Sequence, residues 1–304
     1  MPTTLPLRPP IVVCHMAAWD ARFPPNSLEA IRACLIANVA FIEIDITALA
    51  SEDYLLVHDP VLESETDGHG LVAATTPDQA RTLHIKHRDQ PTDHPVPLLS
   101  QVVDLFLHYP GRTRLQCDFK NIYPFPAEEP YARLINLLAP LGDRVIVSSG
   151  ADWQLRRLRR LDSSLDLGFD IGNNLDWRAL DELADPRVPP WKFGAYGYFD
   201  DHPVAGFRFT SAREYLLERC DLFANSVRGL STFYIDHKLL MHSLKDDDFN
   251  WAEALHGFGI KLDAWTLDTT NALAVTNARL LLDAGVDQFT TNTPVELAAL
   301  LQQA

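Results

Sequence analysis

Short β-prone segments alternate with helical segments along most of this 304-residue chain. Branched and aromatic residues recur in short runs, and the segments between them carry apolar residues at helical spacing. The predicted strands are Ile11–Cys14, Phe41–Ile46, Thr113–Asp118, Val145–Ser148, Leu165–Phe169, Ser231–Ile235, Ile260–Leu267 and Gln288–Thr291. Strands that alternate with helices pair in parallel through right-handed crossovers, and eight of them close a barrel. We therefore predict a single (β/α)8 TIM barrel domain over residues 1–304.

Two stretches interrupt this alternation. After the second strand, Tyr54–Val57 runs back as a hairpin arm, and residues 61–97 form a small insertion rich in Pro, Gly, Asp, His and Thr. One helical piece is predicted there, near Pro77–Arg81. Late in the chain, residues 185–225 form an aromatic-rich insertion that includes Trp191 and Tyr196. We expect this segment to pack on the barrel, to form a contact between subunits of a homo-oligomer, or to contact the substrate.

The composition fits a globular protein without a membrane span. Hydrophobic residues make up 47% of the chain, which is enough for a full core, and no apolar run approaches the ~18 residues that cross a bilayer. The opening Met1–Pro10 has one basic residue and several prolines, so we expect no secretory signal and a cytoplasmic location. Four widely separated cysteines are expected to be reduced, mostly buried thiols: Cys14, Cys34, Cys117 and Cys220.

The charge balance limits the kinds of partner. The formal net charge is −15, which argues against polyanionic partners such as nucleic acid or an anionic membrane surface. A small anionic substrate remains compatible with this charge only if a metal ion or a well-placed lysine provides local positive charge.

Two carboxylates stand two residues apart in an otherwise apolar strand, at Glu43 and Asp45. Because the side-chain period of a strand is two, both leave the same face of the strand. Neighbouring carboxylates repel each other and, if buried, need a cation or a shared proton. The pair therefore indicates either a cation site or an exposed edge strand with a polar outer face.

A (β/α)8 barrel carries its chemistry at the carboxyl ends of its strands. The reactive residues predicted at those ends are His15, Glu43, Asp45, Asp118, Lys120, Ser148, Ser149, Trp265 and Asn292. We expect these side chains to converge on one mouth. Two alternatives stay open: Asp118 is only the partner of Lys120, or Trp265 is a core residue rather than a wall of the site.

Several motifs follow one another along nearly the whole chain. They are His15, Pro25-Asn-Ser-Leu-Glu-Ala30, Glu43-Ile-Asp45, His58-Asp-Pro-Val-Leu62, Thr66-Asp-Gly-His-Gly70, Asp118-Phe-Lys120, Asp263-Ala-Trp-Thr-Leu267, Gly285-Val-Asp287 and Thr291-Asn-Thr-Pro294. In this order, they resemble the glycerophosphodiester phosphodiesterase family, within the superfamily of barrels similar to phosphatidylinositol-specific phospholipase C. The resemblance implies the same barrel fold that the strand count predicts.

The resemblance also implies roles for individual residues. One divalent cation would be bound by three carboxylates, Glu43, Asp45 and Asp118. Ligands that are all oxygen suit Ca²⁺ or Mg²⁺ rather than a soft metal. His15 and His58 would be the general acid and base, and Lys120 would hold a phosphoryl oxygen.

The chain departs from the family pattern at several positions. Met16 stands where the family usually has an arginine after the first histidine, and a second family arginine is replaced near Ser64. Lys120 or Arg22 is expected to replace the lost phosphate contact. Met16, together with Asp rather than Glu at position 118, also resembles the phospholipase D branch of the superfamily. The long 61–97 insertion and the segment beginning at His58 favour the glycerophosphodiesterase side.

These residues predict metal-dependent hydrolysis of a small soluble glycerophosphodiester or sugar phosphodiester to a phosphomonoester and an alcohol, through a cyclic phosphate. Trp265 is expected beside the substrate, and Trp191 and Tyr196 are of the type that covers sugar rings. Two alternatives remain: a phospholipase D-like lyase that ends at the cyclic phosphate, and a catalytically inactive barrel that binds a ligand.

Overall fold

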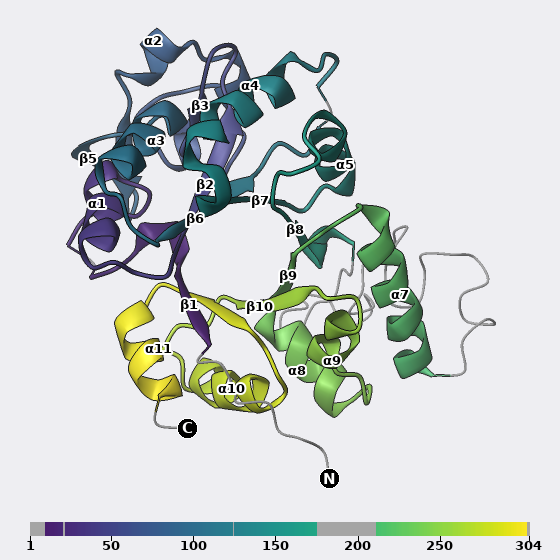
Figure 1. The fold of residues 1–304 in the computed structure, drawn as a ribbon. Helices are drawn as coiled ribbons and strands as arrows, with labels where there is room; N and C mark the ends of the chain where they lie inside the picture. The colour runs from purple at the N-terminus through teal and green to yellow at the C-terminus, as the bar shows by residue number, and fades with distance from the viewer. Residues whose placement is uncertain (1–9, 21, 124, 175–210, 303–304) are drawn as a thin grey trace, which may run out of the picture.

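The computed structural model describes residues 10–20, 22–123, 125–174 and 211–302. Within them, eight parallel strands close a barrel that is surrounded by helices, so the predicted (β/α)8 fold is confirmed (Figure 1). The strand order is β1-β11-β10-β9-β8-β7-β6-β2, and pairing of β1 with β2 completes the ring. Because the first two strands of the sequence meet at this closure, the chemistry predicted on both comes together.

The strand bounds agree with the prediction to within two residues. The barrel strands are β1 (Ile11–Cys14), β2 (Phe41–Ala48), β6 (Arg114–Phe119), β7 (Val145–Ser149), β8 (Leu167–Asp170), β9 (Thr232–Asp236), β10 (Lys261–Trp265) and β11 (Gln288–Thr291). The hairpin arm is also present, since β3 (Tyr54–Leu55) pairs antiparallel with β2.

Helices cover the outside of the barrel. They are α1 (Leu28–Ile36), α3 (Leu99–His108), α4 (Glu129–Leu138), α5 (Asp152–Leu161), α7 (Ala212–Ser226), α8 (His237–Lys245), α9 (Trp251–His256), α10 (Ala272–Asp283) and α11 (Pro294–Leu301). The sequence analysis did not predict α7 or α8. Helix α7 lies almost wholly inside the segment 185–225 assigned to the aromatic insertion, yet its Tyr215, Leu216 and Phe223 are buried in the barrel core. The rest of that segment, residues 185–210, lies outside the described residues.

Strand β2 is buried along its whole length, and its two faces meet different surroundings. Ile42, Ile44 and Ile46 belong to the large core between the barrel and its helices. Phe41, on the other face, packs in a small separate cluster with Val13 and Ile146. Because side chains alternate along a strand, Glu43 and Asp45 share the face of Phe41 and point into the barrel. An exposed edge strand is therefore excluded.

The insertion after β3 contains α2 (Pro77–Ala80) and the hairpin of β4 (His84–His87) with β5 (Gln90–Pro95). Thr76 begins α2 with a capping box that it shares with Gln79. The hairpin was not predicted, because its turn residues Arg88 and Asp89 adopt positive φ angles of 51° and 62° without the glycine that usually marks such turns. A separate apolar cluster lies under the insertion and includes Leu62, Val72, Leu83, Ile85 and Val96.

Two further expectations concern cysteines and membrane spans. All four cysteines are free and buried, as predicted. Within the described residues, no helix is both long enough and apolar enough to cross a membrane.

Gly168 leaves space for a tyrosine inside the barrel, so we predict that Gly168→Ala destabilises the protein. An added Cβ would lie 2.4 Å from the Tyr234 ring and 3.2 Å from the Thr232 carbonyl oxygen, and a close-packed core relieves such overlaps only at a cost of about 1–3 kcal/mol. Gly111→Ala is the control, because its Cβ would make only ordinary contacts, the nearest at 3.4 Å. Urea unfolding measures both variants, and equal free energies of unfolding would contradict the prediction.

Candidate active site at the carboxyl ends of the strands

A cavity of about 290 Å³ opens at the carboxyl ends of the barrel strands. Each barrel strand contributes at least one lining residue, from the strand itself or directly after it: His15, Glu43, Asp118, Ser148, Asp170, Tyr234, Trp265 and Thr290. The lining also includes Met16, Asp45, His58, Glu65, Gln116, Lys120 and Thr266. Of the strand-end residues predicted to converge, all line this cavity except Ser149 and Asn292. Ser149 is buried and donates a hydrogen bond to the Phe119 carbonyl oxygen, whereas Asn292 contacts the cavity residue His15.

Most residues predicted for the site line this cavity. They are His15, Glu43, Asp45, His58, Asp118, Lys120 and Trp265. Arg22 does not line it, because its exposed guanidinium pairs with Asp20 at 2.5 Å. Trp191 and Tyr196 lie outside the described residues.

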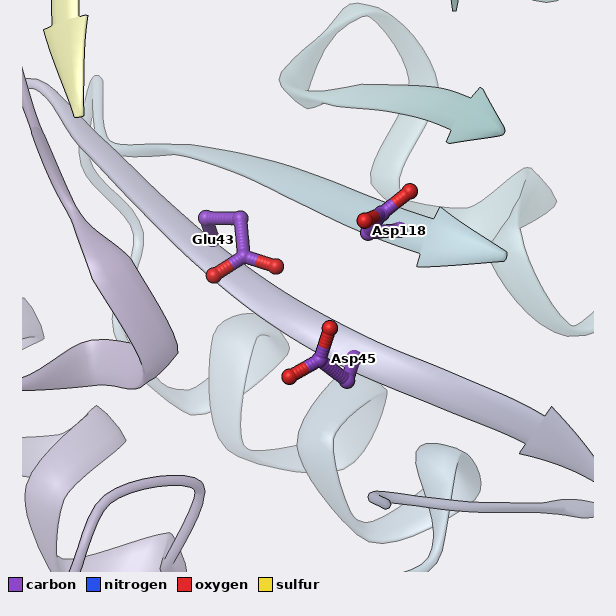
Figure 2. A group of neighbouring side chains, drawn as sticks. All are labelled: Glu43, Asp45 and Asp118. Carbon is purple, nitrogen blue, oxygen red and sulfur yellow. The ribbon is translucent and has the colours of Figure 1, made fainter. Parts of the chain in front are cut away.

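Three carboxylates meet on neighbouring strands, and Figure 2 shows them on β2 and β6. Asp45 stands opposite Asp118 in the parallel register, with Glu43 two residues earlier on β2. Each of the three side chains offers an oxygen within 4.8 Å of the oxygens of the other two. Glu43 and Asp45 are buried, so this negative charge is held away from water.

Lys120 brings a positive charge to the carboxylates. Its Nζ lies 3.1 Å from Asp45 Oδ1 and donates a hydrogen bond to Asp118 Oδ2. Burial opposes the charge on this ammonium, but the negative charges of Asp118, Asp45 and Glu43 outweigh burial and raise the pKa of Lys120. The lysine therefore stays protonated at neutral pH.

The two aspartates and Glu43 differ in how well their charge is compensated. Burial and the charges of Asp45 and Asp118 raise the pKa of Glu43 well above its usual range. Lys120 and the Met16 backbone N–H, 2.8 Å from Glu43 Oε2, only partly oppose this shift. For Asp118, burial is outweighed by Lys120 and by the Ser148 hydroxyl, and its pKa is lowered. The cluster carries more negative charge than Lys120 alone balances.

The two predicted histidines approach the acids from different segments. The His15 ring lies at the end of β1, where its Nδ1 lies 2.9 Å from Asn292 Oδ1 and its Nε2 lies 4.0 Å from Glu43 Oε2. His58 follows the hairpin arm, and its Nδ1 lies 2.8 Å from Asp59 Oδ1. In each ring, an acceptor on Nδ1 fixes the orientation of the imidazole.

The sequence analysis missed six residues of the cavity: Gln116, Asp170, Tyr234, Glu65, Thr266 and Thr290. The first three lie on β6, β8 and β9, and Asp170 directly follows the predicted strand Leu165–Phe169, a position that could have identified it. Burial and the charge of Asp118 raise the pKa of Asp170 to about 7. Glu65 accepts a hydrogen bond from the His58 backbone N–H at 2.7 Å, and burial raises its pKa.

The donor set tests whether a metal fits here. Three carboxylates within reach of a common point offer only oxygen ligands, which are those that Ca²⁺ and Mg²⁺ prefer. Their surplus of negative charge favours a divalent cation over a neutral ligand. The residues present therefore fit one hard divalent cation.

Comparison with known proteins places the chain in a family. The model of the glycerophosphoryl diester phosphodiesterase family matches residues 18–296. A sequence search of curated proteins finds no match.

Solved structures share the fold at low sequence identity. A glycerophosphodiester phosphodiesterase from Parabacteroides distasonis aligns with a TM-score of 0.65 and 15% identity, covering 96% of this chain and 97% of that chain. An Oleispira antarctica phosphodiesterase, solved with the product sn-glycerol-3-phosphate, aligns with a TM-score of 0.61 and 16% identity, covering 96% and 97%. These likenesses support the fold, and the match to the family model covers nearly the whole sequence. The chain therefore belongs to the glycerophosphoryl diester phosphodiesterase family.

Proposed function

We propose that this chain hydrolyses a small phosphodiester to a phosphomonoester and an alcohol, with one divalent cation at the carboxylate cluster. As a member of its family the chain is a phosphodiesterase. Three carboxylates and a protonated lysine share one cavity with two oriented imidazoles, and this arrangement supports the proposed reaction.

Glu43, Asp45 and Asp118 would hold the cation, either Ca²⁺ or Mg²⁺. When bound, it neutralises charge on the phosphoryl oxygens and makes phosphorus more electrophilic. Lys120 adds a fixed positive charge beside Asp45 and Asp118, so it can bind a second phosphoryl oxygen. Together, Lys120 and the divalent cation would offset the three carboxylate charges, so the cluster would no longer repel an anionic substrate.

His15 and His58 are assigned the proton transfers. One imidazole takes the proton of the attacking hydroxyl, and the other gives a proton to the oxygen of the departing alcohol. If the substrate carries a hydroxyl next to its ester, that hydroxyl attacks phosphorus first and forms a cyclic phosphate. Water then opens the ring with the two imidazoles in exchanged roles, so the net reaction consumes one water per diester.

Binding of Ca²⁺ or Mg²⁺ should release protons and tighten as the pH rises. Because the pKa of Glu43 is raised, a cation that binds this carboxylate must displace its proton. At higher pH the carboxyl group is already deprotonated, so binding no longer includes the cost of removing the proton. Glu43→Gln should weaken binding and abolish the proton release, because an amide has no proton for the cation to displace and is a weaker ligand than a carboxylate.

Calorimetry of metal binding in buffers of different ionisation enthalpy measures the protons released. Asp78→Asn is the control, since Asp78 is exposed on α2, where it pairs with Arg81. Binding that is independent of pH, or unaffected by Glu43→Gln, would show that the cation is held elsewhere.

His15→Ala and His58→Ala should each lower kcat by about 10²- to 10⁴-fold on a diester with a poor leaving group. On a diester of p-nitrophenol, whose anion leaves without a proton, only the variant of the general base should remain strongly impaired. Steady-state rates on the two substrates therefore assign the acid and the base. His69→Ala is the control, because its side chain is 84% exposed. Loss of less than about threefold in both variants would refute the assignment.

A further inference from the structure

The active-site cavity contains buried polar atoms without a partner. Trp265 Nε1, Tyr234 Oη and Gln116 Oε1 all belong to lining residues, and none makes a hydrogen bond within the described residues. Buried donors and acceptors are nearly always paired, because an unpaired one loses its hydration without compensation. Three such atoms around one cavity indicate that their partners enter from the cavity itself.

A fourth polar group lies beside these atoms. Asp170 stands opposite Tyr234 in the register of β8 and β9. An added Cβ on Gly172 would lie 3.1 Å from Asp170 Oδ1 and 3.8 Å from Trp265 Cζ2, so the carboxylate and the indole flank the same point. The Gly172 backbone N–H donates a 2.8 Å hydrogen bond to one carboxylate oxygen of Asp170, Oδ1. We call Asp170, Tyr234 and Trp265 the hydroxyl wall. Gln116 lies on the side of the carboxylate cluster, because it stands opposite Glu43 in the register of β2 and β6.

The hydroxyl wall and the carboxylate cluster occupy different parts of the barrel. Asp170, Tyr234 and Trp265 come from the adjacent strands β8, β9 and β10, whereas Glu43, Asp45 and Asp118 come from β2 and β6. In the ring, β7 on one side and β11 and β1 on the other separate the two groups of strands. When the phosphoryl group of a diester binds at the carboxylate cluster, the hydroxyl wall is therefore in a position to contact one of its alcohol groups.

The chemistry of the wall suits hydroxyl groups. The indole N–H donates, the Asp170 oxygens accept, and the Tyr234 hydroxyl does either, while a substrate hydroxyl can both donate and accept. A glycerol diester has two free hydroxyls, and in the cyclic route one of them attacks phosphorus. Only one hydroxyl would then remain for the three polar groups of the wall. An alcohol with several additional hydroxyls supplies the missing partners, and the apolar indole can pack against a sugar ring.

We propose that the hydroxyl wall binds a polyhydroxylated alcohol, a sugar or a polyol with more free hydroxyls than glycerol, as one arm of the diester. The proposal rests on the proposed phosphodiester hydrolysis and names its substrate class. Sites built to hydrogen-bond a hydroxyl discriminate strongly against analogues that lack it, because their own polar groups are left unpaired.

The test compares p-nitrophenyl diesters of a hexose, of the same hexose lacking one hydroxyl remote from phosphorus, and of glycerol. The wild-type enzyme should show kcat/KM at least about tenfold higher for the hexose than for either other diester. Tyr234→Phe removes one hydroxyl from the wall and should lower the hexose-to-glycerol ratio of kcat/KM by at least about tenfold. Tyr109→Phe, outside the cavity, is the control and should leave this ratio unchanged.

Equal or higher kcat/KM for the glycerol diester, or a ratio that Tyr234→Phe does not alter, would overturn the proposal and leave hydrolysis itself intact. If no diester is turned over, hydrolysis fails instead, and calorimetric binding of hexose phosphate and glycerol 3-phosphate decides the question for the wall. Tighter binding of hexose phosphate that depends on the Tyr234 hydroxyl supports the proposal, and equal binding refutes it.

Discussion

The ion pairs of Lys120 with Asp45 and Asp118 determine the electrostatics of the barrel mouth. They help to lower the pKa of Asp118 against the effect of burial, but they leave Glu43 poorly compensated, with a pKa well above its usual range. A site in this condition gains from a divalent cation, because a second positive charge removes the repulsion that one lysine cannot. The same three carboxylates therefore affect both the stability of the metal-free fold and the affinity for the metal.

Barrel closure brings this cluster to the acid and base residues. Pairing of β1 with β2 sets His15 and Met16 beside Glu43, although they are far apart in the sequence. The hairpin arm pairs with the end of β2 and returns His58 to the same mouth. The apolar cluster of Val13, Phe41 and Ile146 lies deeper in the barrel than the carboxylates, so packed apolar side chains support the polar residues of the mouth.

Much of this arrangement was predictable because local patterns and barrel geometry agree. Alternation along β2 fixed the common face of Glu43 and Asp45, and the strand ends located His15, Asp118 and Trp265. Prediction failed where the signal is not local. The hairpin turn at Arg88 and Asp89 lacks glycine, and Tyr234 and Gln116 lie within strands, where only the closed barrel shows that they face the cavity. Helix α7 was missed because it adjoins a segment dominated by aromatic residues.

The central claim is that the carboxylate cluster, with one divalent cation, hydrolyses a phosphodiester. Phosphorus NMR of a glycerophosphodiester incubated with metal-stripped protein, during stepwise addition of Ca²⁺ or Mg²⁺, tests it most directly. The account predicts no conversion before addition, then a phosphomonoester whose rate of formation saturates as a single site fills. Conversion by the stripped protein, or a cyclic phosphate that persists without monoester, would contradict it.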